Sequence, residues 1–261
     1  MEVIIRPTTQ EAVHLTARLI ADAINAKPEF KLGLATGATM EAVYADLAAM
    51  NQRKEVDFSL VKTFNLDEYI GLPPEDKNSY RYYMNHHLFS RINIDMRNTN
   101  LPDGMAKDEI TEGERYEAAI RDCGGIDLQL LGIGSDGHIG FNEPISSLAG
   151  RTRSKALTPA TYVQNSIYFN PPESMPRRAF TMGVGTILDA KRIIMLITGA
   201  KKAGIAAKAI EGPVTSMVTG SALQLHPHTV VILDEAAAAA LTQKDYYNWV
   251  FANEPEWARY R

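Results

Sequence analysis

The segment Leu130-Leu-Gly-Ile-Gly-Ser-Asp-Gly-His-Ile-Gly-Phe-Asn-Glu-Pro144 joins the end of an apolar run to a long glycine-rich stretch. The apolar run, Leu128–Ile133, is typical of a strand that is buried on both faces, as strands of parallel sheets are. The residues that follow are rich in glycine and include a proline, which disfavours a helix. In parallel α/β sheets, ligands bind beyond the carboxyl ends of the strands. We therefore expect this segment to end a buried strand and to contribute to a binding site.

Apolar runs of the same kind recur along the chain and alternate with longer segments of helical period. This alternation predicts βαβ units. We expect a single-domain, Rossmann-like α/β fold: a doubly wound, mainly parallel sheet with helices on both faces. The expected strands are Val3–Ile5, Lys31–Ala35, Val61–Asn65, Leu128–Ile133, Arg192–Thr198 and Thr229–Leu233. The expected helices are Glu11–Ala26, Met40–Met50, Ser79–Ile92, Glu109–Cys123 and Ala200–Glu211.

The last part of the chain differs in composition from the rest. Six aromatic residues lie within Asp245–Arg261, and exposed aromatic side chains at that density are a liability. We therefore expect a domain that spans residues 1–244 and an aromatic tail, 245–261, that docks on the core or on a neighbouring subunit. Just before the tail, the run Ala236–Ala240 has a strong helix propensity, so we expect it to be helical.

Composition excludes several classes of protein. Apolar residues make up 45% of the 261 residues, enough for a sizeable core, and the net charge of −4 offers no basic surface for nucleic acid. Cys123 is the only cysteine, which fits a reducing compartment. The first residues, Met1–Arg6, lack the basic flank and the apolar length of a signal peptide, and no run of about 18 apolar residues predicts a membrane span. We expect a cytoplasmic protein with a small-molecule substrate and no membrane or nucleic-acid partner.

The glycine-rich segment after Leu131 holds the richest chemistry. Asp136, His138 and Glu143 lie within eight residues of one another. A histidine flanked by two carboxylates is a tunable acid–base unit, because one carboxylate orients the ring while the other shares its proton. The alternative is a polar surface turn with a solvated histidine.

The same segment contains a pattern that points to a different function. Gly132, Gly134 and Gly137 follow a strand with the spacing of the dinucleotide-binding fingerprint. That fingerprint requires a helix to begin in the turn, so that its N-terminus faces a pyrophosphate. Gly140, Asn142 and Pro144 disfavour such a helix, so we do not expect NAD binding.

A second candidate site is Thr63-Phe-Asn-Leu-Asp-Glu-Tyr69, where a strand ends at a pair of carboxylates. Consecutive residues on a strand point to opposite sides, so we expect only one of Asp67 and Glu68 to face the pocket. The alternative for either carboxylate is a solvated turn residue or a helix N-cap.

Two further turns have the composition of an anion site. Leu32-Gly-Leu-Ala-Thr-Gly-Ala-Thr39 predicts a strand, a turn of small residues and a helix N-terminus, which offers backbone N–H groups and a favourable dipole to a phosphate. Ile197-Thr-Gly-Ala-Lys-Lys-Ala203 has the same plan, and a lysine there reaches back to a bound phosphate. The alternatives are a plain tight turn and solvated lysines.

The remaining histidines do not suggest a metal site. His14 stands alone, and His86 and His87 are adjacent on a helix and face different ways. His226 and His228 could share a strand face, but no third ligand accompanies them. We expect no metal.

Three segments carry a resemblance to a known family. Phe64-Asn-Leu-Asp-Glu-Tyr-Ile-Gly-Leu72, Gly134-Ser-Asp-Gly-His-Ile-Gly-Phe-Asn-Glu-Pro144 and Ser221-Ala-Leu-Gln-Leu-His226 resemble the glucosamine-6-phosphate deaminase family, also called glucosamine-6-phosphate isomerase. The similarity runs from about Ile4 to Glu235. The related 6-phosphogluconolactonases also have an Asp-Gly-His turn, but a segment similar to Ser-Leu-Phe-Pro follows it.

The resemblance implies a role for each matching residue. Asp67 stands where the family has its enolisation base, and His138 where the ring-opening base lies, with Asp136 and Glu143 as its supporting carboxylates. The phosphate-binding positions correspond to Thr36, Gly37, Ala38, Thr39 and Lys202. The implied reaction converts glucosamine 6-phosphate to fructose 6-phosphate and ammonia, in amino sugar catabolism, and requires no cofactor.

The chain departs from the family pattern at several positions. The family loop is usually Gly-Gly-Thr-Pro, whereas Gly37-Ala-Thr-Met40 stands here, and Ile167 replaces an arginine that commonly binds the phosphate. Arg177 or Arg178 would be the nearest substitute in the sequence. Some members are hexamers activated by N-acetylglucosamine 6-phosphate, and Ser146, Arg153 and Lys155 resemble that effector site, although Ala156 replaces a usual threonine. We expect a homo-oligomer: a hexamer if allosteric, otherwise a monomer or dimer.

Two other functions remain open at this point. One is a related enzyme on another sugar phosphate, such as galactosamine 6-phosphate or 6-phosphogluconolactone, which the substitution at Ile167 motivates. The other is a non-catalytic sugar-phosphate sensor, although such regulators carry an attached DNA-binding segment.

Overall fold

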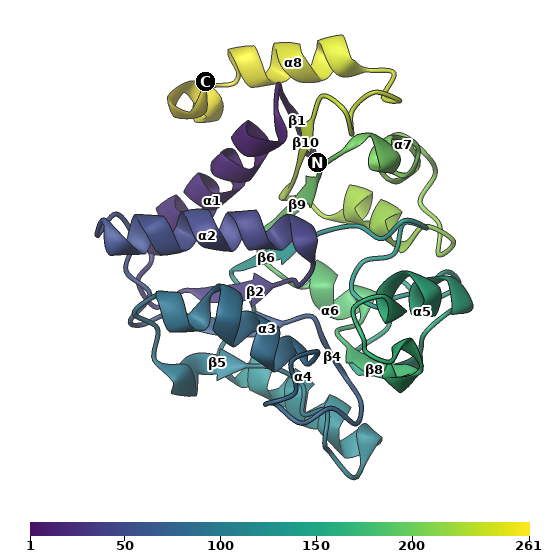
Figure 1. Ribbon diagram of the computed structural model, residues 1–261. Helices are drawn as coiled ribbons and strands as arrows, with labels where there is room; N and C mark the ends of the chain where they lie inside the picture. The colour runs from purple at the N-terminus through teal and green to yellow at the C-terminus, as the bar shows by residue number, and fades with distance from the viewer.

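Seven strands form the central sheet, in the order β1-β10-β9-β6-β2-β3-β5, and every neighbouring pair is parallel (Figure 1). The computed structural model describes all residues from 1 to 261. The strands are β1 (Glu2–Arg6), β2 (Lys31–Leu34), β3 (Lys62–Asn65), β5 (Thr99–Asn100), β6 (Leu128–Leu131), β9 (Ile193–Ile197) and β10 (Thr229–Asp234). All six expected strands are present, and the expected fold class is confirmed.

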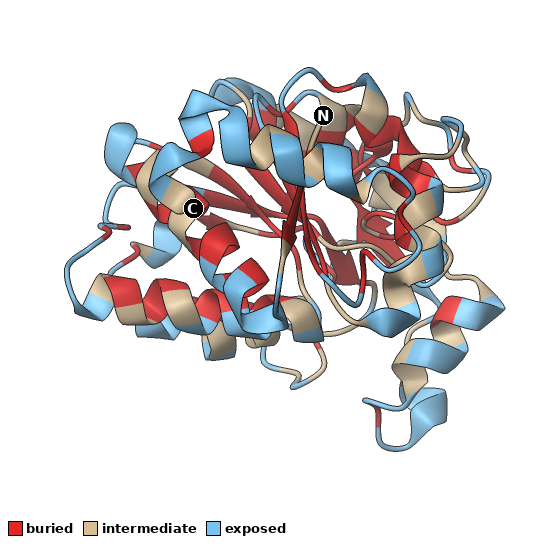
Figure 2. Ribbon diagram, turned by 90° about the horizontal axis from the view of Figure 1, so that it is seen from above, coloured by how far each residue is buried: buried red, intermediate tan, exposed pale blue.

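Helices cover both faces of this sheet. The connections β1–β2 and β2–β3 run in one direction along the sheet, whereas β5–β6 and β9–β10 run in the other. Since such crossovers are right-handed, the first pair of helices lies on one face and the second pair on the opposite face. Figure 2 shows the buried strands enclosed between helices whose outer surfaces are exposed. The four helices are α1 (Thr9–Ala26), α2 (Ala38–Gln52), α4 (Glu109–Asp122) and α7 (Ala203–Ile210).

A small antiparallel sheet, absent from the expectations above, stands beside the large one. Its order is β4-β8-β7, where β4 is Asp67–Tyr69, β8 is Arg178–Thr181 and β7 is Arg153–Ala156. The remaining helices near it are α3 (Tyr80–His87), α5 (Pro159–Ser166) and α6 (Val184–Leu188). The strand that begins at Asp67 thus leaves the large sheet and pairs with a segment more than a hundred residues away.

Three expected helices differ from the structure. The first, expected over Ser79–Ile92, ends at His87 and continues as a 3₁₀ turn, Phe89–Arg91. The second, expected from Ala200, begins as a 3₁₀ turn before α7. The run Ala236–Ala240 forms turns and no helix. The residues before it are tied to distant segments: the Asp234 carboxylate accepts the Gly199 N–H at 3.1 Å, and the Glu235 N–H donates to the Arg6 carbonyl at 3.0 Å. Tertiary context therefore overrides helix propensity in the alanine run.

The aromatic tail packs on the edge of the large sheet. It contains α8 (Lys244–Asn253) and a 3₁₀ segment, Pro255–Tyr260, and α8 lies beyond β1 in Figure 1. Trp257 is 2% exposed and belongs to the main core, and its indole N–H donates to Glu2 Oε2 at 2.6 Å. Trp249 and Tyr246 remain exposed. None of the helices combines the length and apolar character needed to span a bilayer.

The topology defines where a ligand would bind. The chain leaves β2 toward β3 on one side and leaves β6 toward β9 on the other, although β2 and β6 are neighbours. In doubly wound sheets, the crevice at such a switch point, outside the carboxyl ends of the strands, is the usual ligand site. All four turns singled out in the sequence follow strands on this side of the sheet: β2, β3, β6 and β9.

Candidate active site

The turn after β6 has no helix, so it lacks the anion-binding end that a dinucleotide fingerprint requires. Its shape is set by backbone bonds: Gly134 N–H donates to the His138 carbonyl at 2.8 Å, and Gly137 N–H donates to the Gly134 carbonyl at 3.1 Å. Gly137 has φ +93°, a value that side chains rarely allow. The expectation against NAD binding is consistent with this geometry.

The turn brings His138 between two carboxylates. Nδ1 of His138 lies 2.6 Å from Asp136 Oδ1 and 3.3 Å from Glu143 Oε2. The side chain of His138 is only 13% exposed, which rules out the solvated surface histidine that the sequence left open. The Glu143 carboxylate is held in turn by the Thr158 N–H, at 3.2 Å, at the start of α5. The three ligand atoms lie within 4.8 Å of one another, so the group has the spacing of a cation site as well.

The electrostatics of this group favour a charged imidazole. Burial lowers the pKa of His138, but the Asp136 and Glu143 carboxylates outweigh it and raise the pKa to about 9. Burial would raise the pKa of Asp136, yet the imidazolium holds it at about 2, and the pKa of Glu143 is lowered in the same way. At neutral pH the cluster is therefore an imidazolium braced by two carboxylates.

Asp67 lies next to this turn, as the sequence predicted from the shared sheet edge. In the small sheet Asp67 pairs with Thr181, and the Thr181 hydroxyl accepts a hydrogen bond from the Phe141 N–H at 2.9 Å. A methyl group added at Gly140 would stand 3.6 Å from Asp67 Oδ2. One strand pair and one hydroxyl thus fix the distance between the Asp67 carboxylate and the turn that carries His138.

The environment of Asp67 raises its pKa strongly. Its side chain is 6% exposed, and burial, followed by repulsion from Glu68, raises the pKa to about 8, against a smaller opposing effect of His138. A buried carboxylate without a partner of its own, next to an imidazolium, has the properties of a general base that acts in a closed site.

Glu68, the neighbouring carboxylate, differs from Asp67 because it binds backbone N–H groups. Its carboxylate accepts from the N–H groups of Tyr69, Tyr80 and Arg81 at 2.8, 2.9 and 2.9 Å, so it holds the N-terminus of α3. The prediction that only one of the two carboxylates faces the pocket is consistent with this. Glu68 is not itself the N-cap of α3, which is Ser79, but it binds the same helix end from β4. Burial raises the pKa of Glu68 to about 7, although these three bonds oppose the rise.

The predicted phosphate residues lie at the same edge. Thr36 and Thr39 are half-buried, whereas Gly37 and Ala38 are exposed at the start of α2. The Lys202 ammonium donates to the Ile133 carbonyl, in the turn after β6, at 2.8 Å. Burial lowers the pKa of Lys202, and nearby Asp136 partly offsets the effect. The Thr36–Thr39 turn, the His138 turn and Lys202 therefore follow three adjacent strands, β2, β6 and β9.

The residues that resemble an effector site follow Glu143 in the sequence. Ser146 is buried and its hydroxyl has no hydrogen-bond partner. Arg153 Nη1 donates to Asn142 Oδ1 at 2.8 Å, and Lys155 follows on β7. The position with the unusual residue, Ile167, is 74% exposed at the end of α5.

Arg177 and Arg178, the possible substitutes for the arginine that Ile167 replaces, both have other partners. Arg178 pairs with Glu109 at 2.6 Å, and the Arg177 guanidinium lies 5.8 Å from the centre of the Tyr162 ring.

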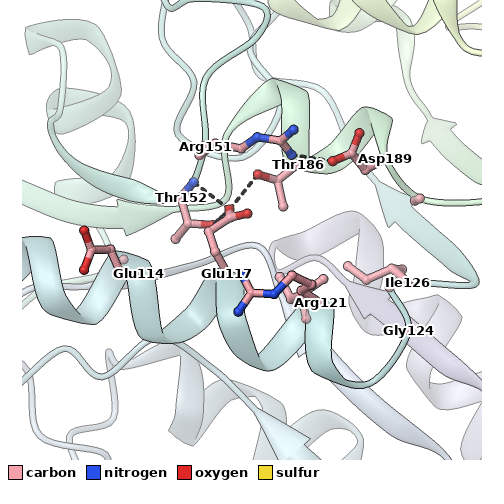
Figure 3. Close-up of a pocket in the computed structure, with 13 residues that line it drawn as sticks. Glu114, Glu117, Arg121, Gly124, Ile126, Arg151, Thr152, Thr186 and Asp189 are labelled. Carbon is pink, nitrogen blue, oxygen red and sulfur yellow. Dashed lines mark hydrogen bonds and ion pairs between the residues drawn. The ribbon is translucent and has the colours of Figure 1, made fainter.

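A cavity of about 680 Å³ opens elsewhere, beside α4 (Figure 3), and contains none of the predicted site residues. At its centre Glu117 Oε1 accepts from Thr152 N, Thr152 Oγ1 and Thr186 Oγ1 at 2.8, 2.5 and 2.6 Å. These bonds tie α4 to the segments around β7 and α6, a structural role.

Comparison with known proteins addresses the family directly. Residues 6–232 match the family model of glucosamine-6-phosphate isomerases and 6-phosphogluconolactonases. A glucosamine-6-phosphate deaminase of Hahella chejuensis is 48% identical over 96% of this chain and 95% of its own. The chain belongs to the glucosamine-6-phosphate deaminase family. A further member, from Streptomyces coelicolor, is 45% identical over 98% of this chain and 99% of its own.

Solved structures extend the family relation to the fold. A structure described as a monomeric glucosamine-6-phosphate deaminase superposes with a TM-score of 0.90 at 42% identity, over 92% of this chain and all of that one. A 6-phosphogluconolactonase from Leishmania guyanensis, 20% identical over 91% of this chain and 97% of its own, superposes with a TM-score of 0.70 and shares the fold. The resemblance found in the sequence is thus confirmed at the level of the family.

Proposed function

We propose that this chain is a glucosamine-6-phosphate deaminase, which forms fructose 6-phosphate and ammonia. The observation that carries the proposal is the placement of Asp67, a buried carboxyl with a pKa of about 8, next to an imidazolium braced by two carboxylates. Full-length relatives that are 45–48% identical and carry this name support the choice of substrate.

The first step opens the sugar ring. His138 is protonated at neutral pH, so it donates its proton to the ring oxygen as the bond to C1 breaks, and takes up the proton that the anomeric hydroxyl releases. Asp136 and Glu143 hold the ring in place and stabilise its positive charge. Positioned acid–base groups of this kind contribute roughly 10²–10⁴-fold in rate.

The second step moves a proton from C2 to C1. The ionised Asp67 carboxylate removes the proton from C2 while the protonated His138 donates a proton to O1, which gives an enolamine. Asp67 then returns its proton to C1, which leaves a protonated imine at C2. Water then adds to C2 and ammonia leaves, so fructose 6-phosphate remains. The phosphate, held by the turn Thr36–Thr39 and by Lys202, supplies the orientation that the proton transfer needs.

The proposal is tested by incubating the purified protein with glucosamine 6-phosphate and measuring ammonia and fructose 6-phosphate in equal amounts. Galactosamine 6-phosphate and 6-phosphogluconolactone serve as parallel substrates, since the shared family model includes lactonases. A folded protein that turns over one of these alternatives faster, or that binds sugar phosphates without turnover, would overturn the assignment.

Assembly, regulation and location belong to the same proposal. We retain the prediction that Ser146, Arg153 and Lys155 form an effector site, because Arg153 is bonded to Asn142, the residue before Glu143. The homo-oligomer is also a prediction, and the relative described as monomeric makes the monomer the state to test first. Light scattering measures the oligomeric state, and the rate of ammonia release with and without N-acetylglucosamine 6-phosphate measures activation. Cys123, the single cysteine, supports a cytoplasmic location.

A further inference from the structure

A tyrosine on α3 is bonded to the turn that would bind the phosphate. The Tyr83 hydroxyl donates to the Gly37 carbonyl at 2.9 Å, across 46 positions of sequence. The same carbonyl accepts the Met40 N–H at 2.9 Å, the first bond of α2. Tyr83 lies outside every motif that the sequence analysis singled out, and the reaction steps above do not use it.

The bond to Gly37 controls the direction of an N–H group. A trans peptide is planar, so its carbonyl and the following N–H point in opposite directions. A hydroxyl that holds the Gly37 carbonyl toward α3 therefore directs the Ala38 N–H away from α3. Ala38 is the first residue of α2, where N–H groups have no intrahelical acceptor and are available to an anion.

Apart from the bond to the Met40 N–H, no other contact of the Gly37 carbonyl restrains the peptide between Gly37 and Ala38. Gly37 has φ +118° and ψ 163°, a region that is open essentially to glycine alone. No side chain caps α2 at this position, and a methyl group added at Gly37 would find no atom within 4 Å. Tyr83 is thus the one side chain that holds this peptide, in addition to the backbone bond from the Met40 N–H.

Tyr83 is itself well fixed. Glu68 and Ser79 hold the N-terminus of α3, with Ser79 Oγ accepting the Tyr82 N–H at 3.0 Å. The Tyr83 ring packs on His87, with centroids 4.4 Å apart. Burial raises the pKa of the Tyr83 phenol, so its hydroxyl remains a donor at neutral pH.

We propose that Tyr83 is a positioning residue that aims the Ala38 N–H at the substrate phosphate. The inference rests on the proposed function, because it assigns the turn to the phosphate of that substrate. Loss of one donor weakens phosphate binding equally before and during the proton transfers, while the remaining donors keep the substrate oriented, so KM rises and kcat is unchanged.

The test compares Tyr83→Phe with Tyr82→Phe, which removes a neighbouring hydroxyl that makes no hydrogen bond. One hydrogen bond to an anion site corresponds to a roughly fivefold to tenfold effect. We expect Tyr83→Phe to raise KM for glucosamine 6-phosphate, and the inhibition constant of inorganic phosphate, by this factor, with kcat within about twofold of the wild type. Tyr82→Phe is expected to change none of the three.

A double-mutant cycle separates this role from a structural one. Ala38→Pro deletes only the N–H, at a helix position where proline is well tolerated. In that background Tyr83→Phe is expected to change KM by less than about twofold, because the group it aims is absent.

Several results would overturn the inference. They are an unchanged KM in folded Tyr83→Phe, a fall in kcat without a rise in KM, and full additivity with Ala38→Pro. Calorimetric titration with inorganic phosphate tests the inference without turnover, so it gives a result even if the wild type releases no ammonia and the proposed function fails.

Discussion

The replacement of Asp67 by asparagine should abolish activity and yet stabilise the protein. The carboxyl is 6% exposed, and its pKa is raised from 3.8 to about 8, chiefly by burial. The unfolded chain releases this proton near pH 4, whereas the folded protein keeps it until about pH 8. Between these values the folded state binds more protons, so the wild type loses stability as the pH rises.

The magnitude follows from the size of the shift. At 1.36 kcal/mol for each pKa unit, the shift from 3.8 to about 8 costs the wild type about 2 kcal/mol at pH 5 and about 4 kcal/mol at pH 7. Asparagine has no proton to release, so the variant escapes this loss. Its advantage over the wild type should therefore grow by about 2–3 kcal/mol between pH 5 and pH 7.

Urea unfolding of the ligand-free proteins at the two pH values measures this difference. Asp136→Asn is the matched control, because the pKa of Asp136 is lowered to about 2. Its carboxylate stabilises the fold above about pH 4, so the control should be less stable than the wild type at both pH values. An advantage of Asp67→Asn that stays constant with pH, or a variant that is less stable at pH 7 than at pH 5 relative to the wild type, would refute the reasoning.

Three further results are expected. The pH profile of kcat/KM should be bell-shaped, rising as Asp67 ionises near pH 8 and falling as His138 loses its proton near pH 9; a flat profile from pH 6 to 10 would contradict both assignments. Gly134→Ala places a methyl group against the His138 ring, so kcat should fall more than tenfold while circular dichroism is unchanged; full activity would show that the ring has room to move. Ile167→Arg adds a bidentate donor, so KM for the sugar phosphate should fall severalfold, whereas Ile167→Gln should not lower it.

The sequence predicts the edge of the sheet where chemistry occurs better than it predicts the contacts there. Buried parallel strands are near-continuous apolar runs, so β6 and β9 are readily found, and the turns after them must share one edge. The order of strands and turns along the chain is therefore enough to predict that Asp67, His138 and Lys202 lie at one edge. Glycine and proline composition is likewise sufficient to exclude a helix after Leu131.

Long-range pairing accounts for what the sequence did not predict. The strands β4 and β8 are short, and their pairing of Asp67 with Thr181 has no local signal. The hydrogen bond from Tyr83 to Gly37 is equally non-local, and the α3 pattern around Tyr83 indicates only a helix. The prediction for Ala236–Ala240 is wrong for the converse reason. The local helix preference of the alanines gives way to the tertiary context, and the run forms turns.

The two edge strands of the large sheet limit the ways in which two copies of the protein can associate. An unpaired edge strand can pair with a strand of another molecule, which leads to fibres or domain-swapped dimers. One edge strand, β1, packs against α8 (Figure 1), and the opposite edge strand, β5, is only two residues long. The large sheet therefore offers no long unpaired edge to a second copy, so an assembly through this part of the molecule must use side-chain surfaces. Removal of the tail after Leu241 would uncover β1, so we expect the shortened chain to aggregate more readily than the full chain.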